Sequence, residues 1–259
     1  MERIADYGVY TGGMRKSMND KLWFVGKIDG ATEIVDYGCA DGALLKYVSD
    51  SMPDVFSLKG IDIDKRMLDM ARSNVGCDFF TPDEYVSGCL DSAKNACLNC
   101  GSVIHEVYSY GTEQDIEKFW NFAFDSGFRY ISIRDMAMTI VDTPPDGELY
   151  DAIHEVLDNR TYAKQFFDYG WRTDEPIDWR FLVHFLLKYR YVENWEREKN
   201  EQYLPLYMEE ILLKIPTDKY RVKWFEHYTL PFLKDKVHKD FGIHLNKKTH
   251  YKLLLERIL

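Results

Sequence analysis

The stretch "TEIVDYGCADGALLKYV", residues 32–48, decides the fold. It begins with the apolar run of a buried strand, turns sharply through Gly38 and Gly42, and continues with the apolar spacing of a helix. Glycines between a strand and a helix let backbone N–H groups face a ligand, because no Cβ stands in the way. The G-x-G-x-x-G spacing of dinucleotide-binding turns is absent, and Asp36 would repel a phosphate but could pair with an ammonium group. The turn therefore favours a ligand that carries an amino-acid moiety.

The next predicted strand ends in "GIDID", which places Asp62 20 residues after Gly42. An acid at the tip of the neighbouring strand can accept hydrogen bonds from two ribose hydroxyls. Taken together, the turn at Asp36 and the acid at Asp62 imply a ligand with an amino acid at one end and a ribose at the other.

On these residues the chain resembles the class I S-adenosylmethionine-dependent methyltransferases. The segment 36–42, "DYGCADG", matches the family's first motif, (D/E)-x-G-x-G-x-G, with Ala40 in place of the middle glycine. The segment 60–72, "GIDIDKRMLDMAR", resembles the second motif and the helix that follows it. The resemblance implies S-adenosyl-L-methionine as the cofactor and S-adenosyl-L-homocysteine as the product.

The resemblance also implies which residues hold the cofactor. Asp62 is expected to bind the ribose, Ile63 to pack on the adenine, and the glycine loop with Asp36 to surround the methionine end. The expected cofactor-binding residues are Asp36, Tyr37, Gly38, Cys39, Ala40, Asp41, Gly42, Asp62, Ile63 and Ser102. The acid that would bind the adenine after the third strand stays open between Asp78 and Asp83.

Strands and helices alternate between residues 31 and 141, the S-adenosylmethionine-binding core, which predicts a parallel sheet with helices on both faces. Residues 142–216 read as helices only and predict an inserted helical cap on the substrate side, while residues 217–259 hold the last two strands. With the resemblance, the expected fold class is α/β: a Rossmann-like, doubly wound, mostly parallel seven-stranded sheet with an antiparallel edge strand. Residues 1–30 are expected to form a helical lid over the cofactor.

The run "GSVIHEVYSYG" ends the fourth predicted strand, and in the family that this chain resembles this end lines the reaction centre. It places His105, Glu106 and Tyr108 beside the methyl donor as candidate catalytic residues. Because the sulfonium is already activated, the protein must position the acceptor and often remove its proton. His105 has the intrinsic pKa of a general base, Glu106 could orient it or bind a cationic acceptor, and Tyr108 could hydrogen-bond the acceptor. The alternative is that His105 caps the strand and Glu106 is solvated.

Three further residues are candidates for substrate binding. Arg134 in the fifth predicted strand could clamp a carboxylate or phosphate of the acceptor, or it could pair with Asp135 or another acid as part of the structure. Tyr10 and Arg15 in the predicted lid are the other two. No metal is predicted, because the C-x-x-C pair at Cys97 lacks a second pair and lies in a predicted strand.

The charge of the chain is uneven and leaves two classes of acceptor open. The net charge is −10, yet residues 180–259 carry 16 Lys and Arg against 11 Asp and Glu. The acidic whole makes DNA an unsuitable partner, and neither a (D/N/S)-P-P-(Y/F) motif nor a Pro-Cys pair follows the fourth strand. No apolar run is long enough to span a membrane and the first residues lack an apolar signal core, so a soluble, cytoplasmic protein is expected.

The leading hypothesis is a methyltransferase that acts on a small-molecule acceptor under the helical cap. One alternative is an RNA methyltransferase that uses the basic C-terminal third, where aromatic and cationic residues interleave. The other alternative is a non-catalytic S-adenosylmethionine-binding partner protein.

Overall fold

The predicted alternation forms a seven-stranded sheet with the strand order β3-β2-β1-β4-β5-β7-β6. The computed structural model describes residues 18–88, 90–170 and 177–258. The strands are β1 (Glu33–Tyr37), β2 (Ser57–Ile61), β3 (Asp78–Phe80), β4 (Ala96–Gly101), β5 (Tyr130–Met136), β6 (Tyr220–Tyr228) and β7 (His250–Arg257). Neighbouring strands from β3 to β5 are parallel, whereas β7 is antiparallel to both β5 and β6. The predicted fold class is confirmed, with the antiparallel strand one position inside the edge that β6 forms.

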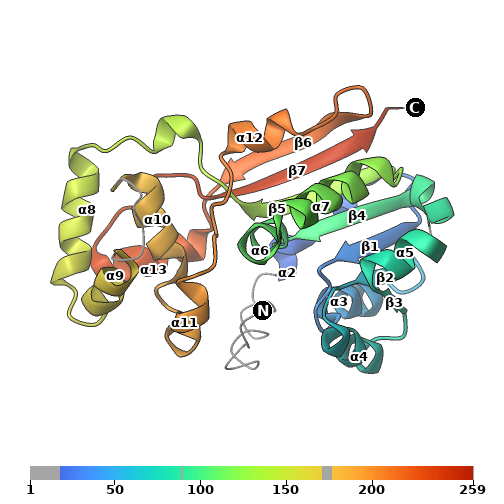
Figure 1. Ribbon diagram of the computed structural model, residues 1–259, viewed down its shortest axis with the longest axis horizontal. Helices are drawn as coiled ribbons and strands as arrows, with labels where there is room; N and C mark the ends of the chain where they lie inside the picture. Colours follow the sequence, from blue (N-terminus) through green and yellow to red (C-terminus); the bar gives the residue numbers. More distant parts are fainter. Residues whose placement is uncertain (1–17, 89, 171–176, 259) are drawn as a thin grey trace.

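Helices cover the sheet and also build a second, helical lobe beside it (Figure 1). The helices of the sheet lobe are α2 (Met18–Lys21), η1 (Val25–Lys27), α3 (Ala43–Ser51), α4 (Lys65–Asn74), α5 (Pro82–Gly88), η2 (Leu90–Asn95), α6 (Ile104–Tyr110), α7 (Glu113–Asp125) and α12 (Met208–Leu213). After the connecting turn η3 (Ile140–Asp142), the helical lobe contains α8 (Gly147–Asp158), α9 (Ala163–Gly170), α10 (Trp179–Lys188), η4 (Val192–Asn194), α11 (Trp195–Glu198) and α13 (Pro231–Phe241). Within the described ranges, no helix combines the length and apolar character needed to cross a bilayer.

The central strands are buried on both faces. Val35 and Leu98 lie in the core cluster that α7 covers, whereas Ile34 and Cys97 lie in the cluster on the α3 and α4 side. This division follows from the geometry of a strand, in which successive side chains point to opposite faces. Burial on both sides explains why these strands read as nearly continuous apolar runs in the sequence.

The sequence predicted a strand over residues 95–104, but β4 ends at Gly101 and a helix begins at Ile104. Ser102 adopts a φ of +63°, and α6 begins at Ile104. The carboxylate of Asp135 in β5 accepts hydrogen bonds from the N–H groups of Ile104, at 2.8 Å, and His105, at 3.3 Å. The first N–H groups of any helix lack an intrahelical partner, so Asp135 stabilises a helix start at this position.

The helical lobe contains segments that precede β6 in the sequence and one that follows it. The predicted domain boundaries did not include the second segment in the cap. Helix α13 lies between β6 and β7 in the sequence, yet its Leu233, Val237 and Phe241 belong to the same core cluster as α8 and α10. Helix α12, inside the predicted cap, packs instead in the core of the sheet lobe. The spacing of four residues between the buried positions of α13 is typical of a helix face, but the sequence analysis assigned residues 217–259 to strands only.

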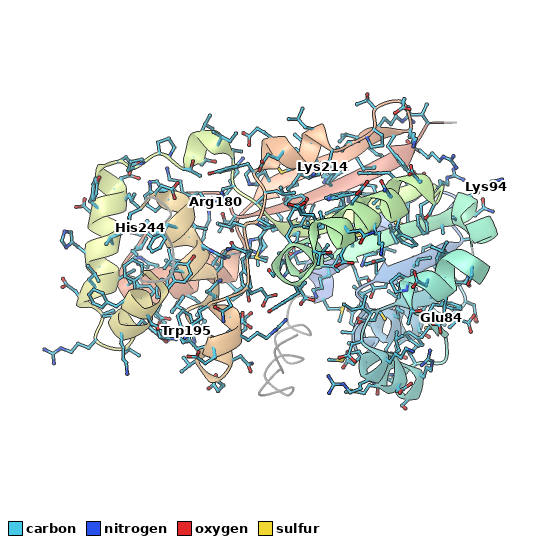
Figure 2. The ribbon with its side chains drawn as sticks, in the orientation of Figure 1. Glu84, Lys94, Arg180, Trp195, Lys214 and His244 are labelled. Carbon is cyan, nitrogen blue, oxygen red and sulfur yellow. The ribbon has the colours of Figure 1, made fainter. Side chains whose placement is uncertain are left out.

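Helix α10 anchors the segment that returns from the helical lobe to the sheet. Arg180, labelled in Figure 2, donates a hydrogen bond to the carbonyl of Leu204, and its guanidinium lies 4.4 Å from the ring centroid of Tyr207. Nζ of Lys188 donates a hydrogen bond to the carbonyl of Glu201 at 2.6 Å. These contacts fix the backbone of this segment at the boundary between the lobes.

Candidate functional site

A cleft of about 2550 Å³ lies between the sheet lobe and the helical lobe, and we call it the interlobe cleft. The described residues that line it include Lys21, Tyr37, Gly38, Ala40, Asp62, Ile63, Ser102, His105 and Glu106 from the sheet lobe, and Leu186, Tyr191, Arg197, Glu201 and Tyr203 from the helical side. Its floor is formed by the carboxyl ends of β1, β2 and β4, where open α/β sheets bind ligands. A pocket for one drug-sized ligand has roughly 300–1,000 Å³, so this cleft has room for two ligands side by side.

The glycine loop after β1 is fixed by its backbone geometry and by Asp62. Gly38 and Gly42 have φ values of +75° and +76°, and Ala40 has a φ of +47°. The N–H of Ala40 donates a hydrogen bond to Oδ2 of Asp62 at 2.8 Å, which ties the loop to the tip of β2. Of the predicted loop residues, Tyr37, Gly38 and Ala40 line the interlobe cleft.

Two other residues of the predicted loop set have buried side chains. Cys39 belongs to the core cluster on the α3 side, where burial raises the pKa of its thiol. Asp41 is also buried, and its Oδ1 accepts a hydrogen bond from the N–H of Ala43 at 3.2 Å. Neither residue lines the interlobe cleft, so their side chains support the loop from behind.

Replacing Gly38 by alanine is expected to lower the free energy of unfolding by about 1–2 kcal/mol, the cost of a positive φ for a residue with a Cβ. A Cβ at this position would also lie 2.7 Å from Cγ2 of Val103, so one of the two segments must shift. Gly147→Ala is the matched control, because its Cβ would meet no atom within 4 Å. Urea unfolding of both variants checks the prediction, and equal stability of the two would contradict it.

Asp36 lies at the end of β1, behind the glycine loop. It is 5% exposed, and its Oδ1 accepts a hydrogen bond from Nδ2 of Asn99 at 2.7 Å. Burial raises the pKa of Asp36 to about 6, although the Asn99 hydrogen bond and the charge of Lys21 act in the opposite direction. Asp36 does not line the interlobe cleft, so the predicted contact between Asp36 and the methionine end is not direct.

The raised pKa of Asp36 predicts a pH-dependent contribution to stability. Between the ordinary aspartate pKa of 3.8 and about 6, the folded protein holds a proton that the unfolded chain has released. A rise in pH through this window therefore lowers the stability contributed by this carboxyl group. Asp36→Asn stays neutral, so we expect it to gain stability relative to the wild type as the pH rises through the window. Urea unfolding at several pH values tests this, and a pH-independent difference between the two proteins would refute it.

Asp62 and Ile63 stand together at the tip of β2 and line the interlobe cleft. The two carboxylate oxygens of Asp62 accept hydrogen bonds from the N–H groups of Ala40 and Asp64, each at 2.8 Å. Burial raises the pKa of Asp62, whereas these two hydrogen bonds lower it. The side chain of Ile63 is 64% exposed, an unusual position for a large apolar residue and one suited to packing on a flat ring. Of the two acids left open for the adenine, Asp83 lines the cleft and Asp78 does not.

Helix α6 divides the predicted catalytic residues between two faces. His105, Glu106 and Tyr110 line the interlobe cleft, whereas Tyr108 does not. The hydroxyl of Tyr108 accepts a hydrogen bond from Nε1 of Trp120 at 3.0 Å, so it faces α7. The prediction that Tyr108 contacts the acceptor is therefore corrected: with 3.6 residues per turn, Glu106 and Tyr110 share a face that Tyr108 does not.

His105 has an acidic environment that the sequence analysis did not foresee. Its Nδ1 lies 2.6 Å from Oδ1 of Asp135, and its Nε2 lies 3.6 Å from Oε1 of Glu201. Burial favours the neutral ring, but the charge and hydrogen bond of Asp135, with the charges of Glu201 and Glu106, raise the pKa of His105 to about 9. Such a ring is protonated at neutral pH, so the structure does not support the expected role of His105 as a general base.

Arg134 is part of an internal ion pair. Its Nε and Nη2 each lie 2.9 Å from Oδ2 of Asp20 in α2, and its Nη1 donates a hydrogen bond to Oγ of Ser102 at 3.0 Å. Arg134 pairs with an acid, as one of the two alternatives predicted, and that acid is Asp20 instead of Asp135. Arg134 also lines the interlobe cleft, so its contact with an acceptor stays a prediction. The guanidinium thereby joins α2 to the turn between β4 and α6.

Two cleft residues were missed by the sequence analysis. Lys21 is 8% exposed beside the glycine loop, where burial lowers its pKa and the acids Asp36, Glu106 and Asp135 counteract that effect. Glu201 is 2% exposed, and burial raises its pKa. Lys21 had no signal beyond its place in the predicted lid, and Glu201 lies within a run of charged residues that gave no reason to single it out. The predicted substrate residues Tyr10 and Arg15 lie outside the described residues.

No protein-family model matches the chain, and no curated protein is similar to it in sequence. Among solved structures, a SAM-dependent methyltransferase from Archaeoglobus fulgidus is similar, with a TM-score of 0.52, 11% identity, and coverage of 97% of this chain and 100% of that one. A S-adenosylmethionine-dependent methyltransferase from Mesorhizobium loti (TM-score 0.49, 14% identity, 93% and 96% coverage) is also similar. The plantazolicin methyltransferase BpumL in complex with a triazolic desmethylPZN analog and SAH is similar as well, with a TM-score of 0.49 and 12% identity. This match covers 97% of this chain and 87% of that one. The chain has the fold of the class I S-adenosylmethionine-dependent methyltransferases.

Proposed function

We propose that this chain is an S-adenosylmethionine-dependent methyltransferase whose acceptor is a small molecule bound in the interlobe cleft. The observation that carries the proposal is the position of the glycine loop and Asp62. Gly38, Ala40 and Asp62 meet on one wall of the cleft, and the helical lobe supplies the opposite wall. This wall offers a donor of methyl groups a carboxylate for its ribose and backbone atoms for its methionine end.

The charges near the methionine end suit the donor. The buried carboxyl group of Asp36 favours a cationic neighbour, and the donor carries both an ammonium and a sulfonium group. The ammonium of Lys21 lies in the same part of the cleft and matches the donor's carboxylate. The ammonium and the carboxylate at the amino-acid end of the donor would therefore each have a group of opposite charge nearby.

Aromatic and apolar side chains on the helical side support a small acceptor over RNA. Leu186, Tyr191, Tyr203 and Phe232 line the cleft opposite the sheet lobe. The same wall carries the buried carboxyl groups of Glu198 and Glu201, which pair with Arg197 and so reduce the positive charge that it offers to a phosphate backbone. Eight of the 16 Lys and Arg residues in the basic C-terminal third already pair with acids elsewhere in the chain.

Methyl transfer requires the acceptor atom to lie in line with the bond between sulfur and the methyl carbon. The donor supplies the activation, so positioning is the main contribution that the protein makes. His105 and Glu106 face this part of the cleft, where their side chains can help to position the acceptor.

The proposal is tested by transfer of a radiolabelled methyl group from S-adenosylmethionine into a cell extract that is then separated into small molecules, RNA, DNA and protein. We expect label in the small-molecule fraction, and much less label when Asp62→Ala replaces the wild type at a donor concentration near the wild-type Kd. Label in RNA would establish the RNA alternative instead. Donor binding without label in any fraction would favour the non-catalytic alternative.

A further inference from the structure

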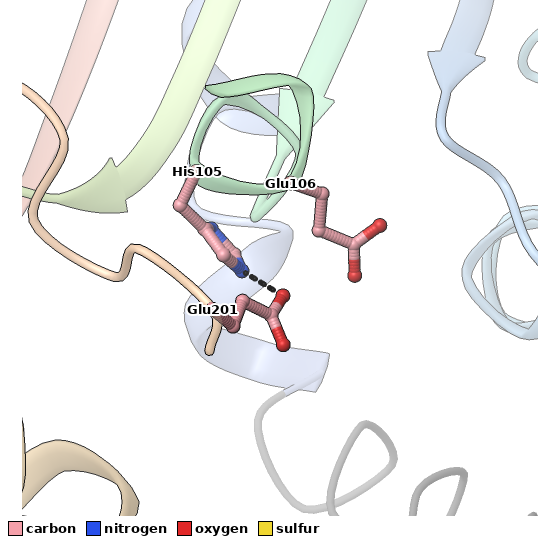
Figure 3. A group of neighbouring side chains, drawn as sticks. All are labelled: His105, Glu106 and Glu201. Carbon is pink, nitrogen blue, oxygen red and sulfur yellow. Dashed lines mark ion pairs between the residues drawn. The ribbon is translucent and has the colours of Figure 1, made fainter. Parts of the chain in front are cut away.

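His105, Glu106 and Glu201 meet on the wall of the interlobe cleft (Figure 3). One imidazole nitrogen and one oxygen from each carboxylate lie within 4.8 Å of one another. Ligands around an octahedral cation with bonds of about 2.1 Å stand about 3.0 Å apart when adjacent and about 4.2 Å apart when opposite. Small side-chain shifts would therefore let the three atoms share one ion.

The imidazole of His105 is buried and aimed at this group. It is 7% exposed, and its Nδ1 is held by Asp135 at 2.6 Å. Its Nε2 forms an ion pair with Oε1 of Glu201 at 3.6 Å, a distance beyond direct hydrogen-bond range. A cation bound to Nε2 would displace the proton that the ring holds there, so binding is expected to release a proton. Histidines that bind metals present one ring nitrogen to the ion and give the other to a carboxylate or carbonyl, as His105 does with Asp135.

The orienting carboxylate is itself rigid. Asp135 is 1% exposed, and it accepts hydrogen bonds from the backbone N–H groups of Ile104 and Met136, at 2.8 and 2.9 Å. On the other side of the cleft, the backbone of Glu201 is fixed through Lys188. The group is therefore held from β5 on one side and from α10 on the other.

Arg197 lies beside the two carboxylates. Its Nη2 lies 3.6 Å from Oε1 of Glu106 and 3.6 Å from Oε2 of Glu201, and its Nη1 lies 3.8 Å from Oε1 of Glu198. These distances are longer than direct hydrogen bonds, so the guanidinium compensates the charge without closing the space between the carboxylates. A divalent cation would compete with Arg197 for this position.

We propose that His105, Glu106 and Glu201 bind one divalent cation and that Asp135 orients His105 for this purpose. One imidazole and two carboxylates suit Mn²⁺ better than Mg²⁺, which prefers oxygen ligands and its own water shell. Three protein ligands leave further coordination positions open towards the cleft, where water or an oxygen atom of a bound molecule can occupy them. The inference concerns cation binding only and does not depend on methyl transfer.

The test is a titration of the full chain, first freed of metal with EDTA and desalted, with MnCl₂, in which the free ion is followed by its electron paramagnetic resonance signal. We expect one saturable site in the wild type. Removing a ligand in Glu201→Gln or His105→Gln, or the orienting acid in Asp135→Asn, is expected to weaken binding about tenfold or more. Glu198→Gln is the matched control: Glu198 is a buried neighbouring carboxylate outside the group, and its loss is expected to weaken binding much less.

Arg197→Met distinguishes a cation site from a simple network of ion pairs. Removal of the competing guanidinium is expected to tighten Mn²⁺ binding, and weaker binding by this variant would overturn the proposal. The absence of saturable binding in the wild type, or equal affinity in the wild type and the ligand variants, would also overturn it. If a buried ligand variant fails to fold by circular dichroism, Glu106→Gln, at the partly exposed position, replaces it. Titration of the same samples with S-adenosylmethionine shows separately whether the proposed donor site fails.

Discussion

The Asp62→Ala variant is expected to bind S-adenosylmethionine roughly 10–150-fold more weakly than the wild type, a loss of about 1.5–3 kcal/mol for charge-assisted hydrogen bonds. In the proposed arrangement, Asp62 accepts hydrogen bonds from the ribose. Its carboxylate is already oriented by the N–H groups of Ala40 and Asp64, so little side-chain freedom is lost when the donor binds. The substitution also releases the glycine loop from the tip of β2, which adds to the loss. Isothermal titration calorimetry measures the effect.

Asp64→Asn is the matched control for this experiment. Asp64 also lines the interlobe cleft and lies two residues from Asp62, but it caps α4 by accepting the N–H of Arg66 at 2.9 Å. An asparagine keeps this cap and removes only the charge. We expect donor affinity close to that of the wild type in this variant. If Asp62→Ala binds the donor as tightly as the control, the proposed position of the ribose is wrong.

The Arg134→Gln variant is expected to lower the free energy of unfolding by about 3–5 kcal/mol, the cost of breaking a buried ion pair from one side. Arg134 is 5% exposed and contacts both Asp20 and Ser102. Lys252 lies 2.7 Å from Asp20, and Tyr228 donates a hydrogen bond to it at 2.6 Å, so Asp20 keeps some compensation. The loss is therefore expected at the lower end of this range.

The structural role of Arg134 can be separated from its predicted contact with the acceptor by urea unfolding of three variants. These variants are Arg134→Gln, Asp20→Asn and the double variant. A coupling free energy of about 1 kcal/mol or more between the two positions is expected. Arg221→Gln is the control, because Arg221 pairs with Glu256 at 2.7 Å on an exposed side chain, where ion pairs contribute about 0–1 kcal/mol. Unchanged stability in Arg134→Gln, together with a raised KM for an acceptor, would show that Arg134 binds the substrate instead.

The positions of the glycine loop and Asp62 could be predicted from the sequence because they depend on local patterns. The strand, the turn through Gly38 and the following helix lie within one short segment, and periodicity and glycine spacing describe such segments well. Asp62 belongs to the next strand, and the carboxyl ends of parallel strands meet at one edge of a sheet. Both groups line the interlobe cleft. The orientation of Cys39 and Asp41 into the protein was beyond prediction, because it depends on how the loop packs on α3.

The acceptor side could not be predicted, because its contacts join residues far apart in the chain. The α6 segment was predicted to be the end of a strand, and the hydrogen bonds from its first N–H groups to Asp135 span about 30 residues. That error placed Tyr108 in the cleft and gave His105 the pKa of an isolated imidazole. Glu201 reaches His105 because the segment between α11 and α12 runs along the boundary between the lobes, and no local pattern specifies that arrangement.

For the helical lobe, the sequence predicted that helices form but not which helices pack together. The run of helices after β5 was predicted from the absence of strand patterns, and α8 to α11 confirm that such helices exist. The return of α13 to this lobe depends on apolar contacts between Val237 and residues of α8 and α10, which are more than 40 residues away. Contacts at that separation leave no periodicity by which to recognise them.

The most direct test of the proposed donor site is a crystal structure of the chain with S-adenosylhomocysteine. We expect the ribose hydroxyls within hydrogen-bond distance of Asp62, the adenine against Ile63, and the amino-acid end beside Gly38 and Lys21. The sulfur should then face the open part of the interlobe cleft near His105. A ligand bound away from Asp62 and the glycine loop, or no ligand at saturating concentration, would contradict the account.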